Sequence, residues 1–338
     1  MRIETPTTAP RRAAVLVIVL LGLLLSVPGL VGAYWVIVIS SALALSIACL
    51  GVNLLLGYTG LLSLGHAAYF GTGAYAGAFL YAFGDAESLE TYLAAGVGAA
   101  TALAAVSGLV CVHATRLHFS ILTVALAQVL HSLFVGGAVF LPFGDRGKGF
   151  YLVGHGGFHI PRFTIAGIDP GPEAFVTVLY YIILTAFLIS LGLMWRLVRS
   201  PFGTALRAIR DNATRAACVG IPVRSYRWRA FVISAMFTGL AGGLTGQLDR
   251  QITPQQLDWF FSIQLVVATV LGGPGRFFGP VGGAFLVVAL KEVALRFALY
   301  HNAILGVLLV AIVIARRRER AATPDRFIPE VGRSAPWA

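Results

Sequence analysis

The sequence predicts an all-α polytopic membrane protein, a single bundle of about ten transmembrane helices. Hydrophobic residues make up 58% of the chain and charged residues 12%, a composition too apolar for a domain surrounded by water. No Asp, Glu, Lys or Arg occurs between Ala13 and Gly84, which leaves room for about three crossings of roughly 20 residues each. The apolar runs are continuous and do not alternate, which favours helices over a membrane barrel.

The apolar runs, divided at Pro, Gly and charged residues, predict the individual crossings. These are 13–31, 34–56, 61–82, 92–113, 118–140, 174–198, 229–248, 260–275, 279–298 and 301–315. The transmembrane domain is therefore expected over 13–315, between an N-terminal tail at 1–12 and a basic C-terminal tail at 316–338. The first run follows Arg11 and Arg12 as in a signal peptide, but its length and the crossing directly after it favour an uncleaved helix.

The charges predict the orientation. Between Arg196 and Arg229 the chain carries eight arginines and one acid, Asp211, and cytoplasmic loops of membrane proteins are rich in Lys and Arg. This loop, over 199–228, and both termini are expected in the cytoplasm, so the net charge of +11 indicates membrane topology and no nucleic-acid partner. The Gly-rich loop 141–173 then lies outside, where it contacts an external partner or covers the mouth of a pathway.

Two segments are too rich in Gly for ordinary transmembrane helices, and they run from Gly57 to Gly77 and from Leu271 to Gly283. One explanation is a pair of broken or re-entrant helices, which membranes tolerate only where the backbone is buried in protein or lines a cavity. Close helix packing through small residues, such as the spaced pairs Gly73/Gly77 and Gly239/Gly243, explains them equally well.

The basic loop predicts two short amphipathic helices. Ser200 and Pro201 are typical of a helix start, with Ser as the N-cap and Pro at the first helical position. Asp211 and Asn212 are expected to cap a second helix, which Gly220 ends. The apolar side chains of the first helix share one face, and they are Phe202, Leu206 and Ile209. Such a pair suits either a groove on a partner protein or the surface of anionic lipid headgroups.

Residue types that carry chemistry are scarce. The chain has no nucleotide-binding P-loop, no nucleophile–base pair, and cysteines whose spacing fits neither a metal site nor a disulfide. We therefore expect no enzyme activity, catalytic residue, metal or cofactor in this chain.

The first eight predicted crossings hold no interior carboxylate. In the ninth, Lys291 and Glu292 precede Arg296, and Glu292 with Arg296 fits an i,i+4 ion pair better than an ion-binding site. Carriers driven by ion gradients place carboxylates inside the membrane, so the energy source is expected outside the chain.

Four long segments carry a resemblance. They are NLLLGYTGLLSLGHAAYFGTGAY (53–75), RLHFSILTVALAQ (116–128), SPFGTALRAIRDNATRAACVGI (200–221) and VLGGPGRFFGPVGGAFL (270–286). In this order they resemble the permeases of branched-chain amino-acid ABC importers, the LivM type. The chain departs from the family pattern at Ala213 and Ala217, where members often carry Glu, and in the outer loop at 143–154.

This resemblance implies a complex in the bacterial inner membrane that receives its substrate from a periplasmic substrate-binding protein. The complex contains this permease, a second permease that is either a paralogue or another copy of this chain, and two ATP-binding subunits. The loop 200–221 then sits in a cleft of the ATPase, and the residues expected to couple the two are Pro201, Gly203, Arg207, Arg210, Asp211 and Gly220. Amino acids are expected to need an apolar pathway with a few polar partners near the broken helices, and the candidates are Asn53, Ser63, Gly65 and His66.

Several alternatives stay open at this point. His66 lies inside the Gly-rich motif, where it either lines the pathway or packs between helices. The same kind of importer takes urea, amides, aromatic acids or other amino acids in place of branched-chain ones. A secondary carrier or channel that works without ATPases is a further alternative, and it differs from an importer in needing no ATPase partner.

Overall fold

The computed structural model of the chain describes residues 22–84, 88–114, 116–135, 158–165, 167, 170–295 and 306. Contacts divide the chain into two compact units, Met1–Val288 and Ala289–Ala338, and the description below concerns the first. Both predicted tails, the beginning of the crossing 13–31, most of the loop 141–173 and nearly all of the crossing 301–315 lie outside the described residues.

Five segments of the described part are long and apolar enough to cross a membrane. They are Ala33–Thr59, Leu89–Cys111, His118–Val135, Ala174–Arg199 and Val223–Asp249. Each coincides within six residues with a predicted crossing, the largest difference being the start of the last span at Val223 in place of 229, because long apolar runs bounded by charges dictate where a helix can lie in a bilayer. The described residues thus confirm a polytopic membrane helix bundle, and the total of ten crossings stays a prediction.

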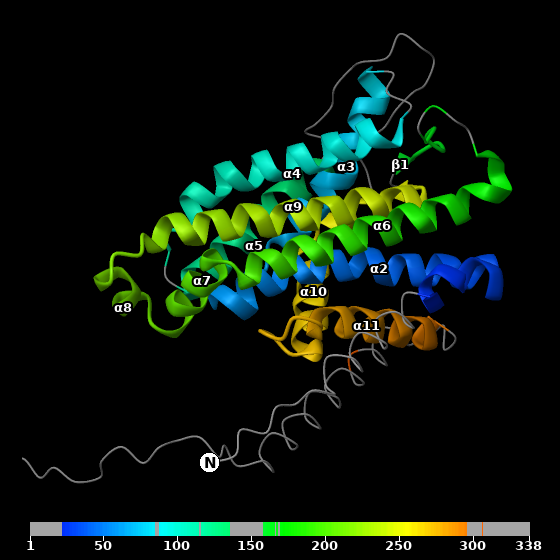
Figure 1. The fold of residues 1–338 in the computed structure, drawn as a ribbon. Coiled ribbons are helices and arrows are strands. Elements are labelled where there is room, and N and C mark those ends of the chain that lie inside the picture. Colours follow the sequence, from blue (N-terminus) through cyan, green and yellow to red (C-terminus); the bar gives the residue numbers. More distant parts are fainter. Residues whose placement is uncertain are drawn as a thin grey trace, which may run out of the picture. The chain divides into compact units, whose positions relative to one another are not determined.

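The centre of the bundle is α9 (Val223–Asp249), which packs against α2 (Ala33–Asn53), α3 (His66–Gly84) and α4 (Leu89–Cys111). Helix α6 (Gly171–Arg199) lies along α2, and the long helices run side by side (Figure 1). Helix α5 (Arg116–Val135) contacts α3 and carries many exposed side chains.

Small residues let these helices approach closely. A Cβ added to Gly73 would overlap the backbone of Gly239, and one added to Gly242 would overlap the carbonyl of Phe70. Without a hydrophobic driving force between helices in lipid, such backbone approach supplies much of the attraction. Packing through small residues is therefore correct for the second half of the segment from Gly57 to Gly77.

The first half of that segment is a broken helix. Helix α2 ends at Asn53 and continues as a single π-helical stretch, η1 (Leu54–Thr59). Gly60, with φ +74°, ends it and begins a loop that reaches α3 at His66. The Thr59 hydroxyl donates to the Leu54 carbonyl (2.9 Å), so part of the irregular backbone is satisfied locally.

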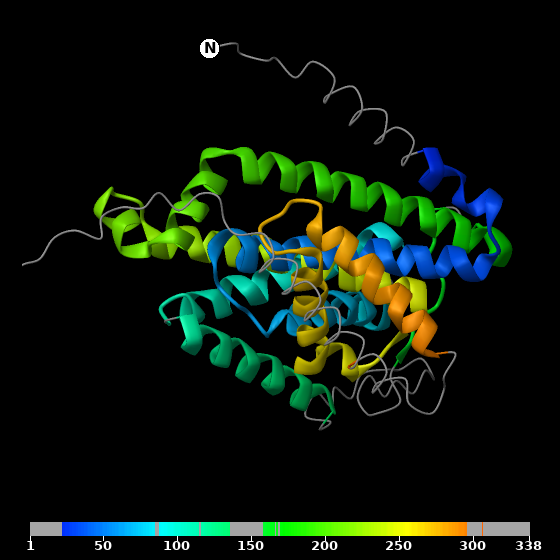
Figure 2. The same ribbon diagram turned by 90° about the horizontal axis from the view of Figure 1, so that it is seen from below.

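The second Gly-rich segment is broken as well. Helix α10 (Trp259–Gly272) stops at Gly273, with φ +99°, and α11 (Gly279–Leu295) begins after a short loop. With 14 residues, α10 is about 21 Å long, less than the roughly 30 Å of a hydrocarbon core. It runs across the direction of the long helices (Figures 1 and 2). Helix α10 lies within three residues of the predicted segment 260–275, and its role as a crossing stays a prediction.

Two strands close one end of the bundle. Strand β1 (Phe158–His159) pairs antiparallel with β2 (Gln251–Ile252), which follows α9 and precedes the 3-10 turn η2 (Pro254–Leu257). Phe163 lies with its ring 5.1 Å from that of Tyr92 in α4. The described part of the loop 141–173 is thus attached to the ends of α4 and α9.

Candidate functional site

The basic loop forms two short helices, α7 (Pro201–Asp211) and α8 (Ala213–Cys218). Asn212 caps α8 as predicted, since its side chain accepts a hydrogen bond from the Arg215 amide (3.0 Å). Ser200 precedes α7 as predicted, but its hydroxyl donates to the Leu197 carbonyl (2.6 Å) and leaves the helix start uncapped by a side chain. Gly220, with φ +89°, follows α8 and ends it.

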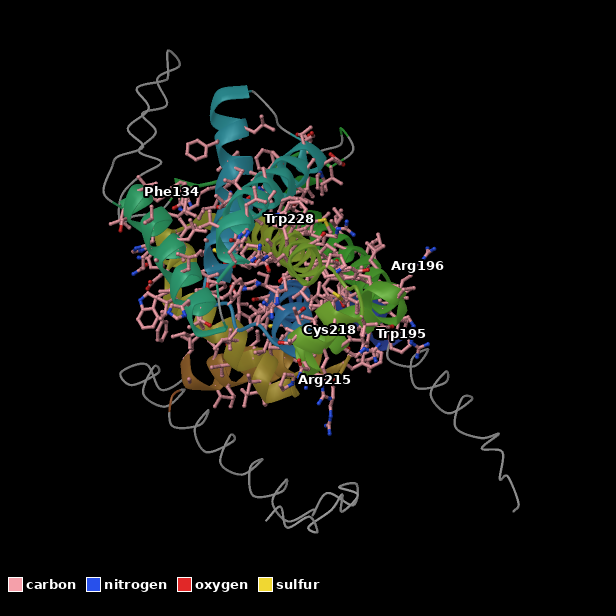
Figure 3. All side chains as sticks on the ribbon, turned by 90° about the vertical axis from the view of Figure 1, so that its left-hand side faces the viewer. Phe134, Trp195, Arg196, Arg215, Cys218 and Trp228 are labelled. Carbon is pink, nitrogen blue, oxygen red and sulfur yellow. The ribbon has the colours of Figure 1, made fainter. Side chains whose placement is uncertain are left out.

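The apolar face of α7 packs onto the bundle. Leu206 and Ile209 are fully buried, and the ring of Phe202 stacks on that of Tyr226 in α9 with centroids 5.4 Å apart. The predicted amphipathic face is therefore confirmed, and it faces the protein interior. The opposite face of the pair is exposed, with Arg215 and Cys218 at the end of the bundle that faces the viewer in Figure 3.

The corner between α6 and α7 is tightly built from two of the predicted residues. A Cβ at Gly203 would overlap the carbonyl of Val198, so the two backbones touch there. The Arg207 guanidinium donates to the same Val198 carbonyl through Nη2 (2.9 Å) and to the Gly203 carbonyl through Nε (3.4 Å). Arg207 thus satisfies the Val198 carbonyl, one of those that the end of α6 leaves without a helical partner.

A second predicted arginine, Arg210, is exposed but bonds to the helix break after α2. Arg210 Nη1 donates to the carbonyl of Gly57 in η1. A Cβ at Gly60 would lie 3.0 Å from Cγ of Arg210, and one at Gly275 would lie 3.0 Å from its Nη1. The glycines around this guanidinium therefore leave space for it, and α7 is tied to the break in α2.

Asn53 ties the same break to the second broken segment. Its Nδ2 donates to the Arg276 carbonyl (3.2 Å), and its Oδ1 accepts from the Gly275 amide (3.0 Å). A Cβ at Gly57 would overlap both Asn53 Oδ1 and the Gly275 amide. We call this set of residues, Asn53, Gly57, Arg210, Gly275 and Arg276, the α7 junction.

The other predicted pathway residues hold the start of α3. His66 Nε2 lies 2.7 Å from the Ser234 hydroxyl, which donates to the Gly51 carbonyl (2.6 Å). A Cβ at Gly65 would overlap the Thr123 carbonyl in α5, and the Ser63 hydroxyl accepts from the Gly65 amide (3.4 Å). All three are buried, at the place where the chain turns from η1 into α3.

The structure thus joins some predicted residues and separates others. Asn53 and Arg210, predicted for the pathway and for coupling respectively, meet in one junction. Pro201, Asp211 and Gly220 are exposed on the outer side of α7 and α8. The sequence did not predict Gly275 and Arg276 as hydrogen-bond partners of Asn53, although Arg276 is the single charged residue in its Gly-rich segment.

No cluster of metal-ligating side chains accompanies these contacts in the part of the chain that the structure describes. The site is a set of backbone and guanidinium hydrogen bonds between a surface helix pair and two broken helices inside a membrane bundle.

The fold and this junction define a polytopic membrane protein whose surface helix pair is hydrogen-bonded to broken helices of the bundle. Residues 34–313 match the family described as the branched-chain amino acid transport system / permease component, and the chain belongs to that family.

Curated relatives agree with this membership. The high-affinity branched-chain amino acid transport system permease protein LivM of Escherichia coli (strain K12) is 27% identical over 277 residues, which cover 79% of this chain and 65% of the relative. The LivM protein of Salmonella typhimurium is also 27% identical, with the same coverage. The autoinducer 2 import system permease protein LsrC of Klebsiella pneumoniae is 27% identical over 152 residues, covering 40% of this chain and 44% of the relative. This chain therefore spans about two thirds of the length of the LivM proteins, and no solved structure matches it.

Proposed function

We propose that this chain is the transmembrane permease subunit of an ATP-binding-cassette importer that moves amino acids across the bacterial inner membrane, with branched-chain amino acids as the favoured substrates. Family membership over residues 34–313 supports the transport role. The names of the LivM relatives support the substrate class. The likeness to LsrC, named for autoinducer 2 import, favours as a second candidate an importer of the same kind for another small polar molecule.

The partners follow from the same proposal. A chain without a nucleotide-binding motif relies on separate ATP-binding subunits, two in a complex with two permeases. A periplasmic substrate-binding protein delivers the substrate to the outer side, and the second permease is a paralogue or another copy. The excess of arginine in the loop 199–228 supports a cytoplasmic location for α7 and α8. The two helices then lie on the side of the membrane where the ATPases bind.

The observation that carries the mechanism is the hydrogen bond from Arg210 to Gly57. Helix α7 is fixed to α6 at Gly203 and Arg207 and to η1 at Arg210, so a displacement of α7 moves the broken part of α2 with it. Asn53 passes that displacement to the loop after α10. ATP-driven closure of the ATPases then reorients elements at the centre of the bundle, where irregular backbone lines a pathway.

Reconstitution of the complete complex in proteoliposomes tests the proposal. With ATP on the side of α7 and α8 and loaded binding protein on the other, we expect uptake of radiolabelled leucine, isoleucine or valine that depends on ATP hydrolysis. Uptake that proceeds equally without ATP, or with this chain alone, contradicts it and supports a secondary carrier. ATP-driven uptake of a different molecule only supports the second candidate.

A further inference from the structure

Three aromatic rings and an arginine meet at the end of α6 that leads into α7. The Trp195 ring lies 4.7 Å, centroid to centroid, from that of Phe277, which lies 4.9 Å from the ring of Phe278. The Arg199 guanidinium stands over the Trp195 ring, 3.7 Å from its centroid. These four side chains, here called the α6 aromatic cluster, join the last turns of α6 to the loop between α10 and α11.

The α6 aromatic cluster is open to the surroundings of the bundle. Trp195 is 37% exposed and Phe278 is 59% exposed, and Arg199 is exposed as well. Large apolar side chains that gather on a surface mark a contact with another protein or with a membrane. No acceptor among the described residues bonds to the Arg199 guanidinium, so its N–H groups are available beside the rings.

The position of the cluster along α6 identifies the membrane as its neighbour. The part of α6 that is long and apolar enough to cross a bilayer runs from Ala174 to Arg199. From Phe175, where Arg162 stands over the ring, about 20 residues or 30 Å of helix lead to Trp195, which is the thickness of a hydrocarbon core. Trp195 therefore lies at the depth of the lipid headgroups, where Trp is enriched, and Arg199 follows one turn further out.

The chemistry of the cluster selects an anionic headgroup. A guanidinium stacked on an indole ring keeps its in-plane N–H donors, and these match the oxygens of a phosphate. Arg196 and Arg276 are exposed next to the rings in sequence and add positive charge. No Asp or Glu occurs from 174 to 210 or from 259 to 291, so the segments that supply the cluster carry no competing carboxylate. Basic residues at this depth attract anionic lipids.

We propose that the α6 aromatic cluster binds an anionic phospholipid of the leaflet on the α7 side, with its phosphate on Arg199 and its glycerol region against Trp195 and Phe278. This inference needs only a chain that spans a bilayer, so it goes beyond the proposed function. A lipid held there bridges α6 and the loop that contains Gly275 and Arg276, two members of the α7 junction. Because a ligand of the folded state stabilises it, the lipid raises the melting temperature.

Fluorescence quenching in nanodiscs tests the site on the full-length chain with the subunits that accompany it. The discs hold phosphatidylcholine and increasing amounts of phosphatidylglycerol brominated on the acyl chains close to the headgroup, since bromine quenches a Trp only on contact. The chain has five tryptophans, so the difference between the wild type and Trp195→Phe isolates the signal of Trp195. We expect half-maximal quenching at a mole fraction about tenfold lower than with brominated phosphatidylcholine, the scale of one charge-assisted hydrogen bond.

Two arginine variants distinguish this site from general attraction to a basic surface. Arg199→Gln removes the guanidinium over the ring, and we expect it to abolish the preference for phosphatidylglycerol while quenching by brominated phosphatidylcholine stays the same. The matched control is Arg196→Gln, which removes the same charge from an exposed side chain that points away from the bundle (Figure 3). We expect this control to keep most of the preference. The rise in melting temperature with phosphatidylglycerol follows the same order and is lost only in Arg199→Gln.

Three outcomes overturn the proposal. Equal losses in the two arginine variants identify long-range attraction by a basic surface, with no site at the rings. Equal quenching of Trp195 by both brominated lipids in the wild type identifies an aromatic belt without preference for a headgroup. A Trp195 signal that neither lipid quenches shows that a protein partner covers the cluster. Each of these results leaves the proposed function standing, because none of them concerns transport.

Discussion

At the scale of single residues, the guanidinium of Arg210 carries the connection between α7 and the bundle. Its bond to the Gly57 carbonyl joins a surface helix to a helix break, and the glycines at 60 and 275 leave it room. Arginine suits this role because its planar guanidinium presents several fixed donors and stays charged.

We expect Arg210→Gln to lower ATP-driven uptake by about tenfold or more, since the variant loses a charge-assisted hydrogen bond. Membrane insertion and ATPase activity remain, because the apolar face of α7 still packs through Leu206 and Ile209. The measurement is uptake per ATP hydrolysed in proteoliposomes, with Arg224→Gln as the control from the same loop, at an exposed position. Equal uptake in both variants would show that the hydrogen bond from Arg210 to Gly57 does not couple α7 to transport.

Gly57 gives a second prediction at this scale. A methyl group there overlaps Asn53 and the backbone of Gly275, so Gly57→Ala is expected to destabilise the protein by about 1–3 kcal/mol, as overpacking does. Gly98→Ala in α4 meets nothing within 4 Å and is expected to be neutral or slightly stabilising, since Ala favours helix. Thermal unfolding in detergent compares the two, and an unchanged melting temperature for Gly57→Ala would refute the close approach.

At the scale of elements, the sequence predicts helices well and their interruptions less well. Long apolar runs between charges predicted α4, α6 and α9 within six residues, because a bilayer admits few other structures. The two Gly-rich segments were left between a broken helix and close packing, and the first of them contains both. Composition cannot separate these, since glycine serves either purpose. The break after α10 at Gly273 was one of the two alternatives left open.

The candidate site was predictable only in part. The positions of α7 and α8 followed from local capping signals at Pro201, Asn212 and Gly220. The meeting of Arg210 with Gly57 did not, because these residues are 153 apart in the chain and no local rule links them.

The contact between α3 and α9 is testable as an element. A Cβ on Gly242 would overlap the Phe70 carbonyl, whereas one on Gly192 in α6 meets nothing within 4 Å. We expect Gly242→Ala to push the two helices apart and to lower the melting temperature, at a cost of about 1–3 kcal/mol. Gly192→Ala serves as the matched control with an unchanged melting temperature. Two identical melting curves would mean that the helices are not in backbone contact.

At the scale of the whole molecule, the account rests on an energy source outside the chain. The predicted crossings hold almost no carboxylates, so ion coupling lacks its usual groups. The family is one of permease components, and the helix pair α7–α8 exposes one face while the other is anchored. These features suit a subunit that is moved by a partner.

Affinity purification of the chain from native membranes, with mass spectrometry of the proteins that accompany it, tests this claim most directly. The account predicts stoichiometric ATP-binding subunits, two for every two permease chains, and their loss when the exposed face of α7 and α8 is altered. A lone chain or homo-oligomer that transports after reconstitution without any ATPase would contradict the account, and would leave the basic helix pair as an element of the membrane surface.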